Sequence, residues 1–295
     1  MERKSQMDIF GAACLIAFAL HMAFNQVVVK VTTGGFNPVF SAGIRSAGAG
    51  FVLLLWMYFR GVPMRIPRAA WAGAIASGLL FTLEFACLFV ALDKGDVGRV
   101  SVILYSMPVW LALAAHVLLP GERLSGLRIV GLVLAMAGVA VALLDRSGGA
   151  SVSWTGDLLA LAAALCWAGI VLCVRITPLS EVEAAPQLMA QVAISGPILL
   201  LIAPLFGPLI RDLQPIFLAG LLFQIIAVGS FGFLVWFWLI KIYPASSVAS
   251  FSFLSPVFSV ILGWLLLSED VAPSVWAALV LVAVGIYLIN RRPTA

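Results

Sequence analysis

Glu84 is the side chain whose type and position most clearly indicate chemistry. It is an acid near the middle of an apolar stretch, residues 69–92, that is long enough to cross a bilayer. A charge at that depth costs at least about 2.5–3.5 kcal/mol, so the carboxylate must face a cavity, a partner or a proton. Phe81, Phe85 and Leu88 share its helical face and would place it on an aromatic wall. Two interpretations stay open: Glu84 binds a substrate amine or a coupling proton, or it is a structural acid that is protonated or ion-paired.

Three more polar side chains lie within apolar stretches. His21 and Asn25 are four residues apart and so occupy one face of a helix. They contact either a solute and water or a neighbouring helix through hydrogen bonds. Arg45 lies about nine residues into the next stretch, where a long side chain can extend to the membrane interface. We expect Arg45 to orient its helix or to pair with a carboxylate.

Two prolines interrupt apolar stretches at comparable places. Pro108 and Pro256 each remove a helical hydrogen bond, which predicts paired kinks that are either hinges or static bends. Other polar and aromatic side chains are expected on the same faces or in neighbouring stretches, where they would contribute to the wall of a solute cavity: Ser101, Tyr105, Trp167, Phe231, Trp238 and Phe253.

The elements that must position these residues are membrane helices. Of the 295 residues, 63% are hydrophobic and 10% are charged, whereas soluble domains have roughly 45–50% and about 25%. The apolar runs carry no period-2 alternation, which excludes a β-barrel. We therefore predict an all-α integral membrane protein with ten transmembrane helices, near residues 8–30, 36–59, 69–92, 97–119, 126–145, 154–175, 183–206, 214–240, 244–268 and 272–290. This arrangement leaves no room for a soluble catalytic or nucleic-acid-binding domain.

Motifs for catalysis and cofactor binding are missing from the sequence. It contains no hydrolase elbow, zinc-ligand spacing, Walker loop or dinucleotide glycine motif, and it has only two His residues. The four Cys residues lie inside apolar runs and are interpreted as packing residues. We expect no enzymatic activity, no metal and no cofactor.

The chain contains an internal repeat. A shift of 148 residues places Pro108 on Pro256, and after one inserted residue it places Glu122 on Glu269. The segment YSMPVWLALAAHVLLPGE thereby lies over FLSPVFSVILGWLLLSE, and the polar linker DRSGGASVSWT falls near the midpoint. We assign residues 1–147 and 148–295 to two five-helix repeats. Because five is odd, the second repeat must be inverted, which is typical of transporters whose site lies between the repeats.

Positive charges predict the orientation in the membrane. With the N-terminus inside, eleven Lys and Arg residues fall in cytoplasmic segments and five fall in the opposite ones. This bias places both termini in the cytoplasm. We expect a multi-pass protein of a bacterial-type inner membrane.

The repeat resembles a known family. The segment FACLFVALDKGDVGRVSVILYSMPVWLALAAHVLLPGERLSGLRIVGLVLAMAGVAVAL resembles the EamA repeat of the drug/metabolite transporter superfamily. The resemblance implies ten helices around a central cavity and export of amino acids, related metabolites or toxic compounds. Two positions depart from the pattern: Asp270 replaces an expected Arg after Glu269, and Gln191 stands where the second repeat would match Arg45.

Together the residues and the resemblance predict a carrier. It would export small amphipathic solutes, such as amino acids with aromatic or bulky apolar side chains, by alternating access between the two repeats. Its expected partners are the solute and the lipid bilayer, with no nucleic acid, and it would act as a monomer or an oligomer. The alternatives are a carrier for phosphorylated sugars or nucleotide-sugars, which calls for more deep cations than Arg45, and a membrane-embedded lipid-modifying enzyme.

Overall fold

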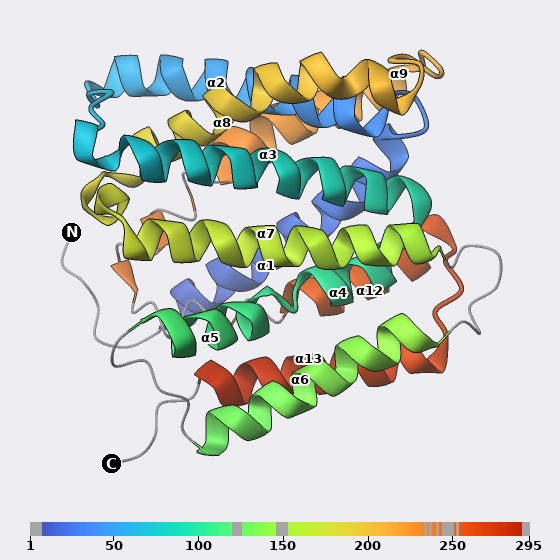
Figure 1. The fold of residues 1–295 in the computed structure, drawn as a ribbon. Coiled ribbons are helices and arrows are strands. Elements are labelled where there is room, and N and C mark those ends of the chain that lie inside the picture. The colour runs from blue at the N-terminus through green and yellow to red at the C-terminus, as the bar shows by residue number, and fades with distance from the viewer. Residues whose placement is uncertain are drawn as a thin grey trace.

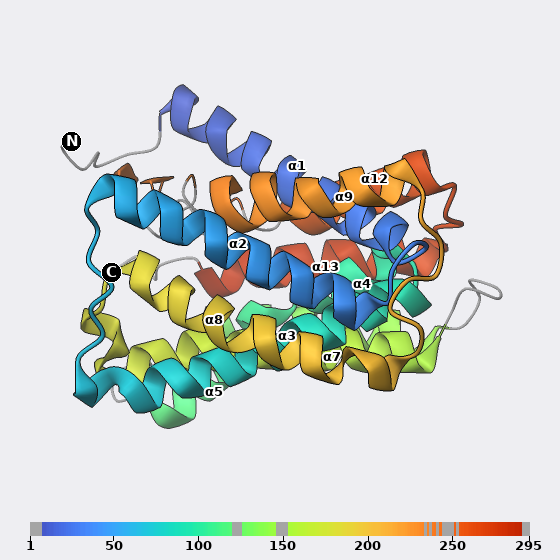
Figure 2. The same ribbon diagram turned by 90° about the horizontal axis from the view of Figure 1, so that it is seen from above.

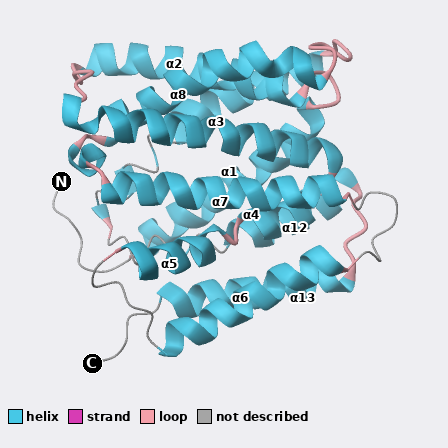
Figure 3. Ribbon diagram, in the orientation of Figure 1, coloured by secondary structure: helices cyan, strands magenta, loops and turns pink. Residues whose placement is uncertain are grey.

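The computed structural model describes residues 8–119, 126–145, 153–232 and 254–290, together with single positions between 235 and 251. In these ranges the chain forms long helices that run roughly parallel or antiparallel to one another (Figure 1). Coloured by secondary structure, the described chain consists of helices joined by loops (Figure 3). Eight of these helical segments are long and apolar enough to cross a membrane, and two shorter apolar helices follow them.

The first half begins with α1 (Ile9–Thr32) and α2 (Pro38–Arg60). A short 3-10 turn (Arg68–Ala70) leads into α3 (Trp71–Lys94). The next predicted span is divided into α4 (Val97–Leu104) and α5 (Met107–Leu118), and α6 (Gly126–Leu144) ends this half.

The second half begins with α7 (Trp154–Ile176), followed by a 3-10 turn (Pro178–Glu181) and α8 (Ala184–Ile202), which continues as the 3-10 turn Ala203–Phe206. Next, α9 (Pro215–Phe223) continues as a π-helix, η5 (Gln224–Gly232). The last helices are α12 (Leu254–Leu267) and α13 (Pro273–Asn290). Each helix lies within, or within a few residues of, a predicted span.

The loops meet at two ends of the bundle. The start of α1 and the end of α13 lie at one end of the bundle, which we call the terminal end (Figures 1 and 2). The connections between α1 and α2, α3 and α4, α8 and α9, and α12 and α13 gather at the opposite end, which we call the linker end.

Helices from the two halves pack directly against each other. The most extensive contacts are those of α6 with α13, α3 with α7, and α2 with α8. Gly131 and Gly285 allow α6 and α13 to approach, because a Cβ atom on Gly285 would lie 2.5 Å from the Gly131 carbonyl oxygen. Small residues of this kind bring membrane helices together where burial of apolar surface provides no driving force.

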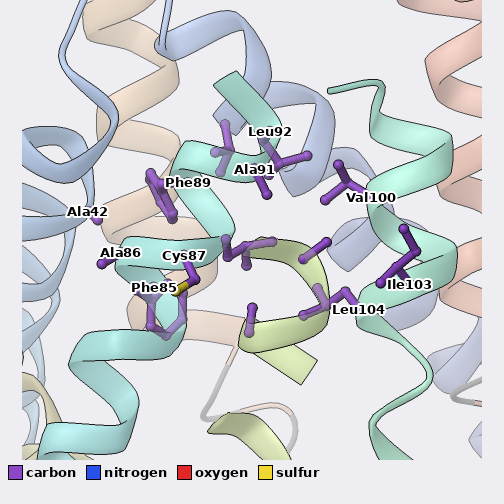
Figure 4. Close-up of a cluster of buried hydrophobic side chains, with 14 of the residues drawn as sticks. Ala42, Phe85, Ala86, Cys87, Phe89, Ala91, Leu92, Val100, Ile103 and Leu104 are labelled. Carbon is purple, nitrogen blue, oxygen red and sulfur yellow. The ribbon is translucent and has the colours of Figure 1, made fainter. Parts of the chain in front are cut away.

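The main apolar core lies between α3, α4 and α7. Phe89 and Leu92 of α3 are fully buried, as are Val100 and Ile103 of α4. Figure 4 shows the side chains of α4 directed toward the second half of α3. This packing fixes the linker-end half of α3 and therefore the position of Glu84 one to two turns before it.

Candidate functional site

A cavity of about 400 Å³ lies in the middle of the bundle. Pockets for small molecules usually measure about 300–1,000 Å³, so this one can hold a solute the size of an amino acid. Helices of both halves line it: α1, α2, α3, the α4–α5 junction, α7, α8, η5 and the start of α12. The lining residues are Leu15, Phe18, Ala19, Met22, Asn25, Gln26, Arg45, Phe81, Glu84, Phe85, Leu88, Leu104, Tyr105, Met107, Trp167, Ile170, Val171, Gln191, Val228, Gly232, Phe251 and Ser255.

Two opposite charges face this cavity. Glu84 of α3 and Arg45 of α2 are both buried, at 7% and 6% exposure, and both line it. The Arg45 guanidinium carbon lies 4.3 Å from the centroid of the Phe85 ring, a cation–π contact. The sequence predicts that Arg45 orients its helix or pairs with a carboxylate. The structure adds that Arg45 is part of the cavity wall.

Aromatic rings form much of the rest of the wall. The Phe81 and Phe85 centroids on α3 are 4.5 Å apart. Tyr105, at the end of α4, meets Trp167 of α7 edge to face at 5.8 Å. The predicted aromatic face around Glu84 and the predicted aromatic residues of two other helices thus lie around one space, which suits the apolar part of a solute.

Helix α1 contributes amides to the wall. Asn25 and Gln26 are 8% and 5% exposed, and within the described residues neither Asn25 Oδ1 nor Gln26 Oε1 has a hydrogen-bond partner. His21 is placed differently, because its Nε2 lies 3.1 Å from the Ala227 carbonyl oxygen and it is not part of the lining. Of the predicted pair on α1, only Asn25 lines the cavity.

Other predicted site residues lie away from the cavity lining. Ser101 is fully buried within α4, and Trp238 packs edge to face on Phe10 with ring centroids 6.3 Å apart. Phe231 is 63% exposed on the outer surface of the π-helix. A π-helix has more residues per turn than an α-helix, so an α-helical pattern assigns its faces incorrectly. Phe253 lies outside the described residues.

Both prolines lie in the first turn of a described helix. Pro108 occupies the first turn of α5, directly after the break at Tyr105 and Ser106 that separates α4 from α5. Pro256 is buried in the first turn of the described part of α12. The predicted kink at Pro108 is therefore visible as a helix break, and whether either proline acts as a hinge stays a prediction.

The cavity ends before it reaches the linker end. Its lining stops at Gln26 in α1 and Leu88 in α3, and it begins only at Leu104 in α4. Toward the terminal end it includes Leu15 and Phe18 of α1. The arrangement is that of a cavity extending toward the terminal end, with the linker end closed.

Polar contacts join the two halves at the linker end. Arg99 of α4 forms a bidentate ion pair with Asp157 of α7, with N–O distances of 2.8 and 3.0 Å. Arg211 pairs with Asp93 at 2.5 and 3.1 Å and also donates to the Thr33 carbonyl oxygen at 2.8 Å. These contacts join α3 and α4 of the first half to α7 and the loop before α9.

Glu269 provides a third contact at this end. From the loop after α12, its carboxylate accepts hydrogen bonds from the backbone N–H groups of Val97 and Gly98, at 2.6 and 3.1 Å. It thereby caps the first turn of α4 from the other half of the chain. Burial raises the pKa of Glu269 above its ordinary value, as does nearby Asp96, while the two N–H donors and Lys30 act in the opposite direction.

The comparisons with known proteins agree with this architecture. The model of the EamA-like transporter family matches residues 9–144 and again residues 154–291. The chain belongs to the EamA-like transporter family. It is therefore a multi-pass membrane protein of the transporter type.

Relatives of this EamA-like transporter extend along its whole length. An uncharacterized transporter YvbV of Bacillus subtilis is 31% identical over 294 residues, covering 98% of this chain and 95% of the relative. A probable amino-acid metabolite efflux pump of Escherichia coli K12 is 27% identical over 273 residues, covering 90% and 89%. A solved structure with 22% identity shares the fold, with a TM-score of 0.65 over 94% of this chain and 95% of that one.

Two residues that line the cavity of this EamA-like transporter, Gln26 and Gln191, were not predicted from the sequence, although their polarity indicates such a role. Gln26 stands beside Asn25 as a second amide in an apolar helix, and Gln191 was noticed only as a departure from the repeat. Both are polar residues at membrane depth, which is itself a reason to expect a pathway. In the described ranges no group of three or more His, Cys, Asp and Glu side chains could hold a metal ion.

Proposed function

We propose that this EamA-like transporter exports small amphipathic solutes, namely amino acids with aromatic or bulky apolar side chains and related metabolites. The observation that carries the proposal is the cavity between the two halves, whose wall combines aromatic rings with buried charges and amides. Aromatic rings suit an apolar side chain, and buried polar groups suit the polar end of the same molecule. The E. coli relative named as a probable amino-acid metabolite efflux pump supports the same solute class.

Transport would proceed by alternating access between the halves formed by residues 1–147 and 148–295. The described state closes the linker end, and breaking its inter-half contacts would open the cavity to the other side of the membrane. The Lys and Arg distribution supports termini in the cytoplasm of a bacterial-type inner membrane. In that orientation the described cavity extends toward the cytoplasm, as an exporter needs for loading.

The test is flux in proteoliposomes. Vesicles are loaded with phenylalanine, leucine, lysine or choline, and exchange with labelled solute outside is followed with and without an imposed proton gradient. Exchange of phenylalanine and leucine is expected, and it should be strongly reduced in Trp167→Ala, which removes one ring from the cavity wall. Equal flux of all four solutes, or none above empty vesicles, would contradict the proposal. Accumulation above equilibrium under the proton gradient would identify a coupled carrier, and exchange without accumulation a facilitator.

A further inference from the structure

Arg45 and Glu84 are oppositely charged, face one cavity and lack the contacts of a structural ion pair. Throughout the described part of the chain, no hydrogen bond and no ion pair within 4.0 Å joins either side chain to another group, and Arg45 Nε is buried without a hydrogen-bond partner. Arg45 and Glu84 therefore line the same cavity with their charged atoms separated by a gap of more than 4.0 Å. Buried charges are costly unless hydrogen bonds satisfy them, so this arrangement calls for a further group in the gap.

The same chain shows what a structural pair looks like. Arg99 and Asp157 meet in a bidentate pair at 2.8 and 3.0 Å, with side-chain exposures of 5% and 2%. Arg45 and Glu84 are buried to a similar degree, but among the described residues neither side chain forms a hydrogen bond or an ion pair within 4.0 Å, and Arg45 Nε is buried without a partner. The Arg99–Asp157 pair is in direct contact and joins two helices. The Arg45 and Glu84 side chains are not in contact, which leaves room for a ligand between them.

The surroundings of Arg45 suit a carboxylate. Its guanidinium stacks over Phe85 at 4.3 Å and lies 5.8 Å from the Phe89 centroid, so the rings contact the face of the cation. Stacking on an aromatic face leaves the N–H groups on the edge free to donate, and these match a carboxylate in geometry. The unpartnered Nε is one of these donors.

The surroundings of Glu84 suit an ammonium group. The cavity wall contains two further hydrogen-bond acceptors besides the Glu84 carboxylate. These are Asn25 Oδ1 and Gln26 Oε1, which have no partners in the described chain. An ammonium group donates three hydrogen bonds and accepts none. One negative charge and two amide oxygens supply the charge and number of acceptors that such a group needs.

We propose that Arg45 and Glu84 are the charge-selecting residues of the solute site, and that the solute is a zwitterion whose carboxylate pairs with Arg45 and whose ammonium pairs with Glu84. This inference rests on the proposed transport function and narrows it. A solute with only an amine or only a carboxylate leaves one buried charge without a partner, and that cost rejects it. The carrier therefore discriminates between molecules of the same size and apolar shape by the number of charges they carry.

The experiment uses three probes that share one ring: phenylalanine, phenethylamine without the carboxylate, and 3-phenylpropionate without the ammonium. Labelled flux is measured in proteoliposomes, and binding is measured separately as the shift in unfolding temperature of the full chain in detergent. The wild type should prefer phenylalanine over each single-charge probe by at least about tenfold, the ratio that 1.4 kcal/mol provides.

Two matched variants should then diverge. Glu84→Gln should lower the preference for phenylalanine over 3-phenylpropionate by about tenfold and keep the preference over phenethylamine, since only the hydrogen bonds between the carboxylate and the ammonium are lost. Arg45→Gln should produce the mirror image. Asp212→Asn and Arg60→Gln remove the same charges at exposed positions and should leave both ratios unchanged. If a cavity variant fails to fold, Asn25→Leu removes one ammonium acceptor without unpairing a charge and should shift the ratios as Glu84→Gln does.

Several outcomes would overturn the charge assignment. It fails if both variants lower transport and binding of all three probes equally, or if the Arg45→Gln/Glu84→Gln double variant regains wild-type selectivity, because either result describes an internal ion pair. The binding measurement separates this failure from failure of the transport function. Charge-selective binding without flux would contradict the proposed function and support the assignment, whereas flux without charge selectivity would do the reverse.

Discussion

Removal of the Asp157 carboxylate should destabilise the protein more than removal of the Asp93 carboxylate, which forms an ion pair at the same end. Asp157→Asn leaves the Arg99 guanidinium buried in α4 without its bidentate partner, at a site where the two side chains are 5% and 2% exposed. Breaking one side of a buried pair costs about 3–5 kcal/mol, whereas an exposed pair contributes about 0–1 kcal/mol. The exposures place this pair in the first class, so we expect a loss of about 3–5 kcal/mol in the free energy of unfolding.

The chain provides a matched control for this prediction. Asp93 pairs with Arg211 at the same end with similar distances, but the Arg211 and Asp93 side chains are 33% and 17% exposed. Asp93→Asn should therefore cost about 0–1 kcal/mol. The assay is denaturant unfolding in detergent micelles, followed by helical circular dichroism for wild type and both variants.

A third variant separates an unpaired charge from lost packing. Arg99→Met/Asp157→Leu replaces both charges by apolar groups of similar size and should recover most of the stability lost in Asp157→Asn. The reasoning is refuted if Asp157→Asn costs no more than Asp93→Asn, or if the double variant is less stable than the single one. A small cost of Asp157→Asn would mean that water reaches Arg99 despite its burial. A less stable double variant would mean that the apolar pair does not pack in the place of the charged one.

Three further predictions concern the loops and the helix break. Because burial raises the Glu269 pKa, the carboxyl's contribution to stability is full below its ordinary pKa of about 4.5 and is lost as pH rises through the raised value. The difference in unfolding free energy between wild type and Glu269→Gln should therefore fall from pH 4 to pH 8, and a constant difference would contradict this. In intact cells an impermeant thiol reagent should label Ser147→Cys and spare Met64→Cys, and the reverse pattern would refute the orientation. Pro108→Ala should slow solute exchange several-fold with little change in unfolding temperature, whereas a wild-type rate would make the helix break a static packing feature.

The helices were the most predictable part of this molecule. The prediction near 8–30 corresponds to Ile9–Thr32, and the prediction near 154–175 corresponds to Trp154–Ile176. A membrane helix must satisfy all its backbone groups over the bilayer thickness, so the length of an apolar run almost determines its bounds. The π-helix Gln224–Gly232 was not predicted, because no residue type in that run distinguishes it from an α-helix.

The orientation of each helix about its own axis was much less predictable. The face around Glu84 was readable because its neighbours lie on the same helix. The sequence favours a role for Arg45 in orienting its helix or pairing with a carboxylate, but it does not place this side chain in the cavity wall. Arg45 lines the cavity because α2 packs between α3, α8 and η5 with that side turned inward. Phe231 was assigned to the cavity and is 63% exposed. The sequence shows which residues share a face of a helix, but the packing of neighbouring helices determines which face points into the cavity.

Glu269 shows how a sequence feature can be identified before its role is visible. It marked the internal repeat through its match to Glu122, which lies outside the described residues, and its spacing gave no hint of a partner 171 positions away in Gly98. In the structure it caps α4, the helix that also carries Arg99. In the proposed alternating access, opening of the linker end would release two contacts of one short helix, and water entering behind α4 would solvate both Arg99 and Glu269 as they separate. A ligand can shift this equilibrium only by its difference in affinity for the two states. Since α4 ends at Leu104 and Tyr105 in the cavity wall, a solute that contacts this end differently in the two states would change the closure at the other end of the same helix.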